Sequence, residues 1–137
     1  MLTSFQNPKV QYVRSLLTQK KVRNKEKSFI CEGVRLAQEA LSHNFQPTLA
    51  LYSASLSKRG KEILTVCKCE KVEATPDLLN RISATEISQG LLLVFPFPSL
   101  SLPSELNFCL VLDEIHDPGN FGTILRAAAA FGVQGLF

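Results

Sequence analysis

The stretch from Asn107 to Phe137 constrains the fold of this chain more than any other part of the sequence. It starts with an apolar run, residues 108–112, which has the length of a strand buried on both faces and is too short for a globular helix. A polar turn follows over residues 113–120. Beyond the turn, apolar side chains recur at the spacing of one helical face: Phe121, Ile124, Leu125 and Ala128.

The same stretch carries signals for both ends of that helix. Asn120 is the predicted N-cap, and Gly132 is the predicted stop. Residues 133–137 are apolar again, as expected of a second strand. The pattern predicts a strand, turn, helix and strand of an α/β sheet, with the chain ending as this unit closes.

Arg126 is the only charged residue between Pro118 and Phe137, and it lies away from the apolar face of the predicted helix. Its neighbours on the outer face, Thr123, Ala127 and Ala130, are small, so we expect another element or another subunit to cover that face. An exposed arginine on an ordinary crossover helix is one interpretation. The other is an arginine held at a site, because a partly buried guanidinium needs an anionic or carbonyl partner.

Composition sets the limits of the fold and of the location. A chain of 137 residues with 45% hydrophobic residues can hold one domain, or one domain and a piece of another. No apolar run approaches the ~20 residues of a membrane span, and no apolar signal region follows the N-terminus, so we expect a cytoplasmic protein. The four cysteines form no C-x-x-C pair, which favours reduced structural thiols.

Basic charge is concentrated near the N-terminus. Residues 1–27 carry seven basic groups and one acidic group, although the net charge of the chain is only +3. A solvated loop and helix face is one explanation for such a run. Five positive charges within residues 20–27 also suit a polyphosphate surface, and we favour contact with nucleic acid. The predicted binding residues are Arg14, Lys20, Lys21, Arg23, Lys25 and Lys27.

Strands and helices alternate from residue 28 to residue 95, so the first domain is predicted to be α/β over residues 1–95. Before them, Asn7 and Pro8 start a helix with Val10, Val13 and Leu17 on its apolar face, and the basic run interrupts it. Residues 96–104 hold three of the seven prolines and are predicted to form a fairly stiff linker. Residues 105–137 are too few to hold a core of their own.

The turn and helix at the end of the chain contain a specific motif. Asp117-Pro118-Gly119-Asn120 is followed by Gly122, and Arg126 stands six residues after Asn120. This combination resembles the first conserved motif of the SpoU (TrmH-like) RNA 2′-O-ribose methyltransferases, which belong to the SPOUT class and have a knotted C-terminal domain. Residues 1–95 resemble the substrate-binding domain of the same family, a small α/β fold related to RNA-binding ribosomal proteins, through residues 4–10, the basic run and residues 29–33.

The resemblance implies a chemistry. Family members transfer a methyl group from S-adenosylmethionine to a ribose 2′-hydroxyl of ribosomal or transfer RNA, and this weak nucleophile must be deprotonated or polarised as it attacks. Arg126 matches the arginine to which the family assigns that activation, and Asn120 matches an asparagine that supports the site. Because a guanidinium is essentially always protonated, holding the adjacent RNA phosphate or polarising the ribose is the easier role. For Asn120, a plain helix cap is the alternative.

The second and third motifs of the family, which build the knot, bind the cofactor and complete the dimer, lie C-terminal to this one and have no counterpart within the 137 residues. We therefore expect residues 105–137 to be the start of a methyltransferase domain without its cofactor pocket. The chain alone is expected to be inactive, and its parent is expected to be a homodimer. A non-catalytic RNA-binding module is the alternative function for this chain.

Two other functions are less favoured. Gly119 and Gly122 do not form the G-x-G-x-x-G turn of a dinucleotide-binding oxidoreductase. Acidic and histidine side chains in the turn could suggest a metal site, but turn and capping roles explain them better and no metal site is predicted; they are Asp113, Glu114, His116 and Asp117.

Overall fold

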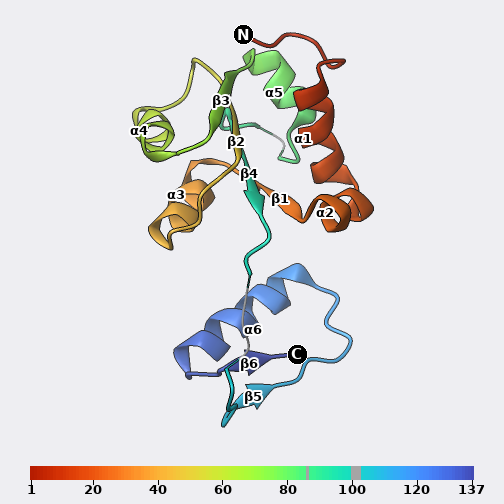
Figure 1. The fold of residues 1–137 in the computed structure, drawn as a ribbon, viewed down its shortest axis with the longest axis vertical. Helices are drawn as coiled ribbons and strands as arrows, with labels where there is room; N and C mark the ends of the chain where they lie inside the picture. Colours follow the sequence, from red (N-terminus) through yellow and green to blue (C-terminus); the bar gives the residue numbers. More distant parts are fainter. Residues whose placement is uncertain (86, 100–102) are drawn as a thin grey trace. The chain divides into compact units, whose positions relative to one another are not determined.

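The structure, a computed structural model, describes residues 1–85, 87–99 and 103–137. They divide into two compact units, Met1–Pro98 and Ser99–Phe137, each described here by itself (Figure 1). Pro96, the first residue of the predicted linker, is the last residue of a strand in the first unit. Residues 100–102 of that linker lie outside the described residues.

A four-stranded mixed sheet forms the centre of the first unit. Its strands are β1 (Ser28–Glu32), β2 (Leu49–Tyr52), β3 (Glu70–Glu73) and β4 (Leu91–Pro96), in the order β1–β4–β2–β3. Strands β2 and β3 are parallel, whereas β4 runs antiparallel to β1 and β2. The α/β class of this unit, predicted from the alternation of strands and helices over residues 28–95, is confirmed.

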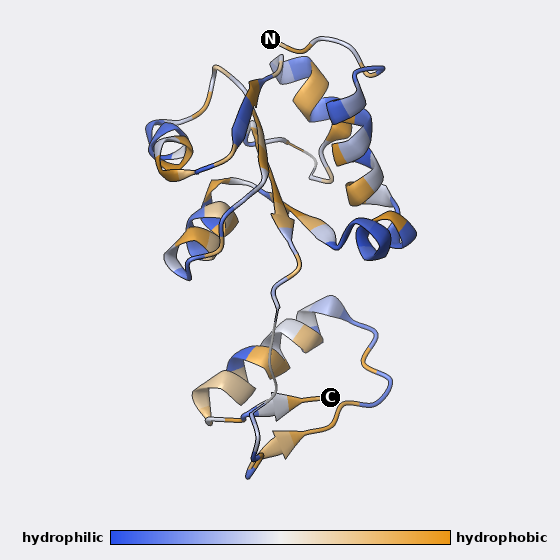
Figure 2. Ribbon diagram, in the orientation of Figure 1, coloured by the Kyte–Doolittle hydropathy of each residue, from blue (hydrophilic) through white to orange (hydrophobic). Residues whose placement is uncertain are grey.

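Helices cover both faces of this sheet (Figure 1). On one face, α1 (Pro8–Thr18) and α5 (Pro76–Ile82) pack with alternate residues of the strands, such as Leu92 and Val94. On the other face, α3 (Val34–Ser42) and α4 (Lys58–Val66) pack with the strand residues that alternate with the first set, such as Leu93 and Phe95. Residues 91–95 are buried throughout, which explains why this strand is continuously apolar (Figure 2).

Helix α1 begins as predicted. The Asn7 side chain accepts a hydrogen bond of 2.9 Å from the Lys9 N–H, and Pro8 occupies the first helical position. Its predicted apolar face packs against the core: Val10 and Val13 are fully buried and Leu17 is half-buried, and Leu16, which was not predicted, is fully buried beside them. The sheet therefore meets α1 slightly to one side of the predicted apolar stripe.

The basic run was expected to interrupt the helices, and this prediction was wrong. Residues Lys20–Glu26 form the helix α2, separated from α1 by the single extended residue Gln19. Lysine, arginine and glutamate are good helix formers, and Val22 packs against the core, so the segment has reasons to be helical. The chain then leaves α2 through Lys27, which adopts the left-handed conformation with φ 48°.

The second unit contains β5 (Cys109–Leu110), α6 (Pro118–Ala130) and β6 (Gly135–Leu136). The two strands pair in parallel across the helix connection, which confirms the predicted strand, turn, helix and strand. The prediction of a first strand buried on both faces was wrong, because Cys109 is exposed and Leu110 is only half-buried. Two short strands offer too little sheet to bury either face.

Within the described residues, no helix combines the length and the apolar character that crossing a membrane requires.

Candidate functional site

The motif found in the sequence lies at the beginning of α6. Asp117, not Asn120, is the N-cap, and its Oδ1 accepts a 2.6 Å hydrogen bond from the Asn120 N–H. Asp117 precedes Pro118 at the first helical position, and its negative charge is favourable at the positive end of the helix dipole. The predicted cap was therefore wrong by three residues. The Asn120 side chain is left available for another role.

The Arg126 side chain folds back along α6 over Gly122. A Cβ atom added at Gly122 would lie 3.4 Å from Nη1 of Arg126, which shows how close the guanidinium lies to this part of the helix. Nη2 of Arg126 donates a hydrogen bond of 3.1 Å to Oγ1 of Thr123. Gly122, Thr123 and Arg126 thus share one face, as residues three and four apart on a helix do.

The structure does not bring Asn120 and Arg126 onto the same face. Six residues separate them, which corresponds to roughly 120° of rotation around the helix. Both side chains are exposed, and no carboxylate of the described residues lies within ion-pairing distance of Arg126. This arrangement leaves a guanidinium whose remaining donors face outward and can hold an anionic or carbonyl group.

The expected burial of α6 is not observed within this chain. Of the predicted apolar face, only Ala128 is buried, while Phe121 and Leu125 are 39% and 41% exposed. Thr123, Ala127 and Ala130 on the outer face are exposed too, so no described element of this chain covers that face, and cover by another subunit stays a prediction. The short β5–β6 pair covers only a small part of a helix of 13 residues.

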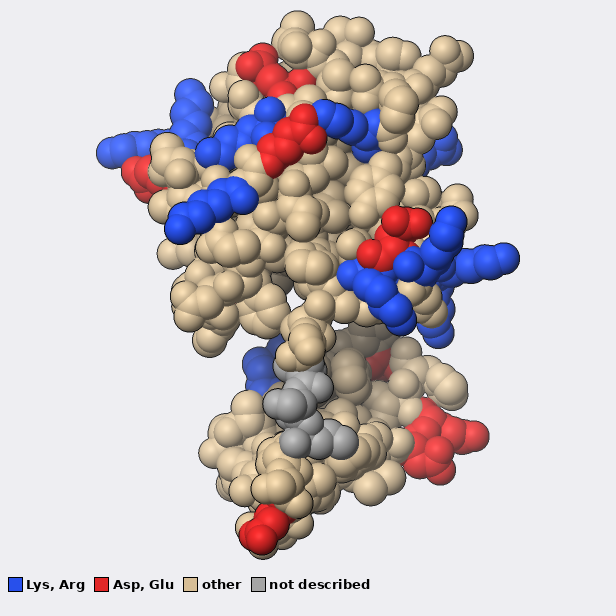
Figure 3. All heavy atoms as spheres, viewed as in Figure 1, with Lys and Arg blue, Asp and Glu red and all other residues tan. Residues whose placement is uncertain are grey.

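The second candidate site is the basic helix α2 with its flanking residues. Arg14, on α1, and Lys20, Lys21, Lys25 and Lys27 are all exposed. Figure 3 shows the basic side chains gathered where α2 lies in Figure 1, with few acidic groups among them. The first turn of α2 has no acidic residue, so Lys20 and Lys21 stand unscreened at the positive end of the helix dipole. A polyanion bound beside these lysines would offset the unfavourable interaction with the helix dipole.

Arg23 differs from the other basic residues of α2. It is half-buried, and its Nη1 donates hydrogen bonds to the carbonyl oxygens of Leu16, at 2.8 Å, and Leu17, at 3.2 Å. These carbonyls belong to the last turn of α1, which has no internal donors left to satisfy them. Arg23 thus holds α2 against α1, a structural role that charge counting did not distinguish from binding.

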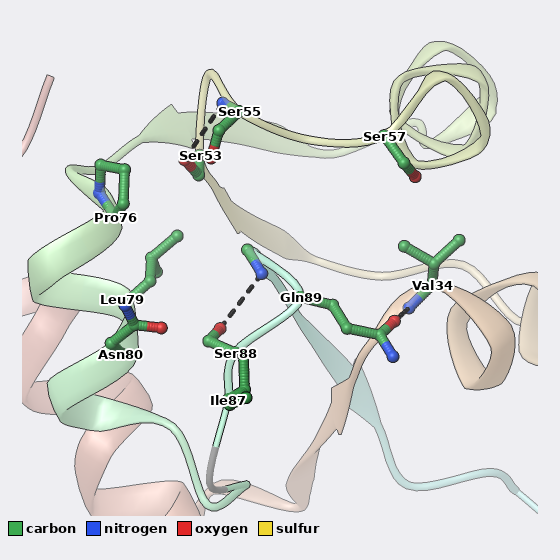
Figure 4. Close-up of a pocket in the computed structure, with 11 residues that line it drawn as sticks. Val34, Ser53, Ser55, Ser57, Pro76, Leu79, Asn80, Ile87, Ser88 and Gln89 are labelled. Atoms are coloured by element: carbon green, nitrogen blue, oxygen red, sulfur yellow. Dashed lines mark hydrogen bonds between the residues drawn. The ribbon is translucent and has the colours of Figure 1, made fainter.

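A polar cavity that the sequence did not predict opens at the far end of the sheet from α2, with a volume of about 490 Å³. Its polar lining consists of uncharged side chains, namely Ser53, Ser55, Ser57, Asn80, Ser88 and Gln89 (Figure 4). Oε1 of Gln89 accepts a 2.8 Å hydrogen bond from the Val34 N–H. These residues come from several separate segments, and no local spacing in the sequence links them.

The cysteines take no part in either candidate site. Cys31 and Cys67 are buried, and burial raises the pKa of each thiol from 9.0 to about 11. Both thiols are therefore protonated and unreactive near neutral pH. Among the described residues, no group of three or more histidine, cysteine or acidic side chains is placed to hold a metal ion.

The described residues of the second unit do not fit S-adenosylmethionine. A hollow of about 230 Å³ lies between α6 and β6, lined mainly by apolar residues and main chain. Its one polar side chain, Gln134, already accepts hydrogen bonds from the N–H groups of Asn107, at 2.8 Å, and Phe108, at 3.3 Å. The hollow thus offers a charged cofactor no charged side chain and no free side-chain acceptor.

Comparison with known proteins gives a consistent picture. Residues 7–93 match the MRM3-like substrate binding domain, and residues 107–137 match the SpoU rRNA Methylase family. The chain is 31% identical over 95% of its length to a 23S rRNA (uridine(2479)-2′-O)-methyltransferase of Streptomyces viridochromogenes, and covers 48% of that protein. It is 28% identical over 98% of its length to the Bacillus subtilis 23S rRNA (guanosine(2553)-2′-O)-methyltransferase RlmP, and covers 52% of it.

Solved structures agree with these relatives. The crystal structure of the SpoU methyltransferase AviRb from S. viridochromogenes in complex with AdoMet matches 96% of this chain with a TM-score of 0.80 at 28% identity. This chain covers 52% of that structure, and in general it spans about half the length of the curated bacterial relatives above. The model that matches residues 7–93 covers more than half of the chain, so the chain belongs to the family of the MRM3-like substrate binding domain, and its motif helix matches the SpoU rRNA Methylase family.

Proposed function

We propose that this chain supplies the RNA-binding unit and the ribose-activating arginine of an RNA 2′-O-ribose methyltransferase that uses S-adenosylmethionine. The observation that carries the proposal is the Arg126 guanidinium, folded over Gly122 with outward-facing donors and no carboxylate partner among the described residues. Support also comes from the relatives, which are named as 2′-O-methyltransferases of 23S rRNA. Ribosomal RNA is therefore the favoured substrate class, and the cytoplasmic location stays a prediction.

Arg126 would act as a fixed positive charge rather than as a base. Its guanidinium stays protonated, so it can hold the phosphate next to the target ribose or donate a hydrogen bond to the ribose oxygen. Either contact orients the 2′-hydroxyl and stabilises negative charge as it develops on that oxygen. The hydrogen bond to Thr123 limits the motion of the side chain before RNA arrives. Asn120, on another side of α6, is proposed to support the site from its neighbouring turn.

The methyl group would come from S-adenosylmethionine, which the rest of a longer protein must hold, because the described residues do not fit it. A homodimer of that longer protein is part of the proposal. Residues 1–137 alone are expected to bind RNA without transferring methyl groups. By itself, the chain would then act as a non-catalytic RNA-binding module, which is the second candidate function. The exposed lysines of α2 are the observation that favours it.

The catalytic part is tested in a full-length protein that contains this chain. Arg126→Ala should lower methyl incorporation into RNA by roughly 100-fold or more, the effect of removing one electrostatic stabiliser. Thermal unfolding should be unchanged, because the side chain is exposed and contacts only its own helix. The matched control is Arg35→Ala, an exposed arginine on α3, which should retain activity. Activity of Arg126→Ala within a few-fold of the unaltered protein would contradict the assigned role.

A further inference from the structure

The end of α2 is joined to the end of β4. Ser28, the first residue of β1, is paired with Pro96, the last residue of β4. Just beyond this pair, the Phe97 N–H donates a 2.6 Å hydrogen bond to the carbonyl oxygen of Lys27. Phe97 is therefore fixed in position beside the basic segment, although it lies 70 residues further along the chain.

Three aromatic rings lead from the core to the surface at this end of the sheet. Phe95 is fully buried, and its ring stacks with that of Phe29 at a centroid distance of 6.0 Å. The Phe29 ring contacts that of Phe97 at 6.2 Å, tilted by 44°. Phe97 is 39% exposed, so the outermost ring presents part of its surface to solvent. The contact with Phe29 and the main-chain bond to Lys27 restrict Phe97, which lowers the entropy that ligand binding would cost.

The surface beside the rings is apolar. A hollow of about 280 Å³ adjoins Phe29 and Pro98, and its walls include Leu36 and Phe45, which are 52% and 37% exposed. Exposed apolar side chains gathered in this way are typical of a binding surface.

Basic residues adjoin Phe97 along the main chain. Lys27 is exposed and bonded to Phe97 through the main chain, and the Lys25 side chain is 81% exposed. Glu26 approaches Lys25 only loosely, at 3.9 Å. An aromatic ring beside flexible cations is the combination with which proteins bind single-stranded nucleic acid: the base stacks on the ring, and the cations hold its phosphates. Charge complementarity thus favours RNA, rather than an apolar protein surface, as the ligand that binds around Phe97.

We propose that Phe97 is a stacking platform for an unpaired RNA base, held in position by Phe29 and flanked by the phosphate-binding Lys25 and Lys27. The proposal rests on the proposed function and deepens it, since it specifies that the RNA recognised near α2 has an unstacked base. A regular duplex offers no free base face at this point, so single-stranded RNA or a loop should bind better.

The test measures the affinity of the 137-residue chain for a short fluorescent single-stranded RNA and for a duplex of equal length, at several salt concentrations. Phe97→Ala and Phe97→Leu should both weaken single-strand binding by about five-fold or more, because stacking is lost in each. Phe97→Trp should bind at least as tightly as the unaltered chain. The salt dependence should be the same in all three, since no charge changes. Phe131→Ala, which removes a 79% exposed ring from the second unit, is the matched control and should bind normally.

Each other outcome has a clear meaning. If Phe97→Leu binds single strands as well as the unaltered chain does, the ring is not a platform and the inference is wrong, while the proposed RNA binding stands. If the chain sediments as a dimer that Phe97→Leu dissociates, the surface is a protein interface and the inference is again wrong. If the unaltered chain binds neither RNA, the proposed function fails, and this inference fails with it.

Discussion

At the residue scale, the Arg126 side chain lies against a neighbour without a side chain. A Cβ atom added at Gly122 would lie 3.4 Å from Nη1 of Arg126, which is an ordinary van der Waals contact with the end of a flexible side chain. An alanine therefore fits at this position with the guanidinium in place, whereas a longer side chain would compete with the guanidinium for the same face of α6.

The buried thiols make the stability of the first unit sensitive to alkaline pH. Burial raises the folded-state pKa of Cys31 and Cys67 to about 11, whereas the unfolded thiols titrate at 9.0. Their contribution is complete below the unfolded pKa and is lost as the pH rises from 9.0 towards about 11, because the unfolded state then releases protons that the folded state retains. The free energy of unfolding, measured in urea, should fall over this range.

Cys31→Ala should make that fall shallower, even though the lost packing lowers stability at every pH. Cys109→Ala, which alters an exposed thiol, is the control and should leave the pH profile unchanged. An identical alkaline slope in Cys31→Ala and the unaltered chain would show that the thiol does not titrate as described.

Single residues also show where sequence reasoning succeeded and where it failed. Helical spacing identified Arg126 as the one charge away from the apolar face. Asn120 was mistaken for the cap because asparagine and aspartate both cap helices, yet Pro118 marks the first helical position and therefore points to Asp117. The same rule, applied at Asn7 and Pro8, gave the correct start of α1.

At the element scale, α3 depends on a residue far away in the sequence. Its N-cap, Gly33, has no side chain to accept from the first turn. Oε1 of Gln89 does so instead, at 2.8 Å from the Val34 nitrogen. Gln89→Ala should therefore lower the free energy of unfolding by about 1 kcal/mol, the usual effect of losing a cap.

Gln89→Glu should retain most of that stability, because a carboxylate accepts the same hydrogen bond and is favourable at a helix N-terminus. Gln11→Ala, an exposed position within α1, serves as the control and should change stability by less than about 0.5 kcal/mol. Thermal or urea unfolding measures all three. Equal stability of Gln89→Ala and the unaltered chain would contradict the capping role.

A strand or helix could be predicted from the sequence where other elements of this chain bury its apolar residues. Strand β4 is apolar on both faces because helices cover both of them, so its sequence alone identifies it. The strand expected over residues 108–112 is equally apolar, but only Cys109 and Leu110 are paired, with a two-residue partner. Helix α2 was missed because its basic pattern has no apolar period beyond Val22.

At the scale of the whole molecule, the first unit and the motif helix of the second carry different parts of the proposed function. Family and class could be predicted, since the motif of α6 is contiguous in the sequence. The polar cavity around Gln89 and the ring pair of Phe29 and Phe97 could not, because each joins segments that only the folded sheet brings together. The structural role of Arg23 was likewise hidden by its charge.

The central claim, that this chain recognises RNA through α2, predicts how RNA affinity depends on salt. Each lysine that contacts a phosphate releases about one counterion, so the slope of log affinity against log salt counts those contacts. The variant to compare changes Lys20, Lys21, Lys25 and Lys27 together to glutamine, and leaves Arg23 intact because it holds α2 against α1. The matched control changes four exposed lysines elsewhere in the first unit, Lys58, Lys61, Lys68 and Lys71.

Fluorescence anisotropy of a labelled RNA, titrated with the 137-residue chain at several salt concentrations, gives the slope for each protein. If the lysines of α2 contact RNA phosphates, the α2 variant should bind more weakly and its slope should be shallower by roughly three, whereas the control should keep the slope of the unaltered chain. An unchanged slope in the α2 variant would contradict the claim. A control variant whose slope falls as much as that of the α2 variant would contradict it too.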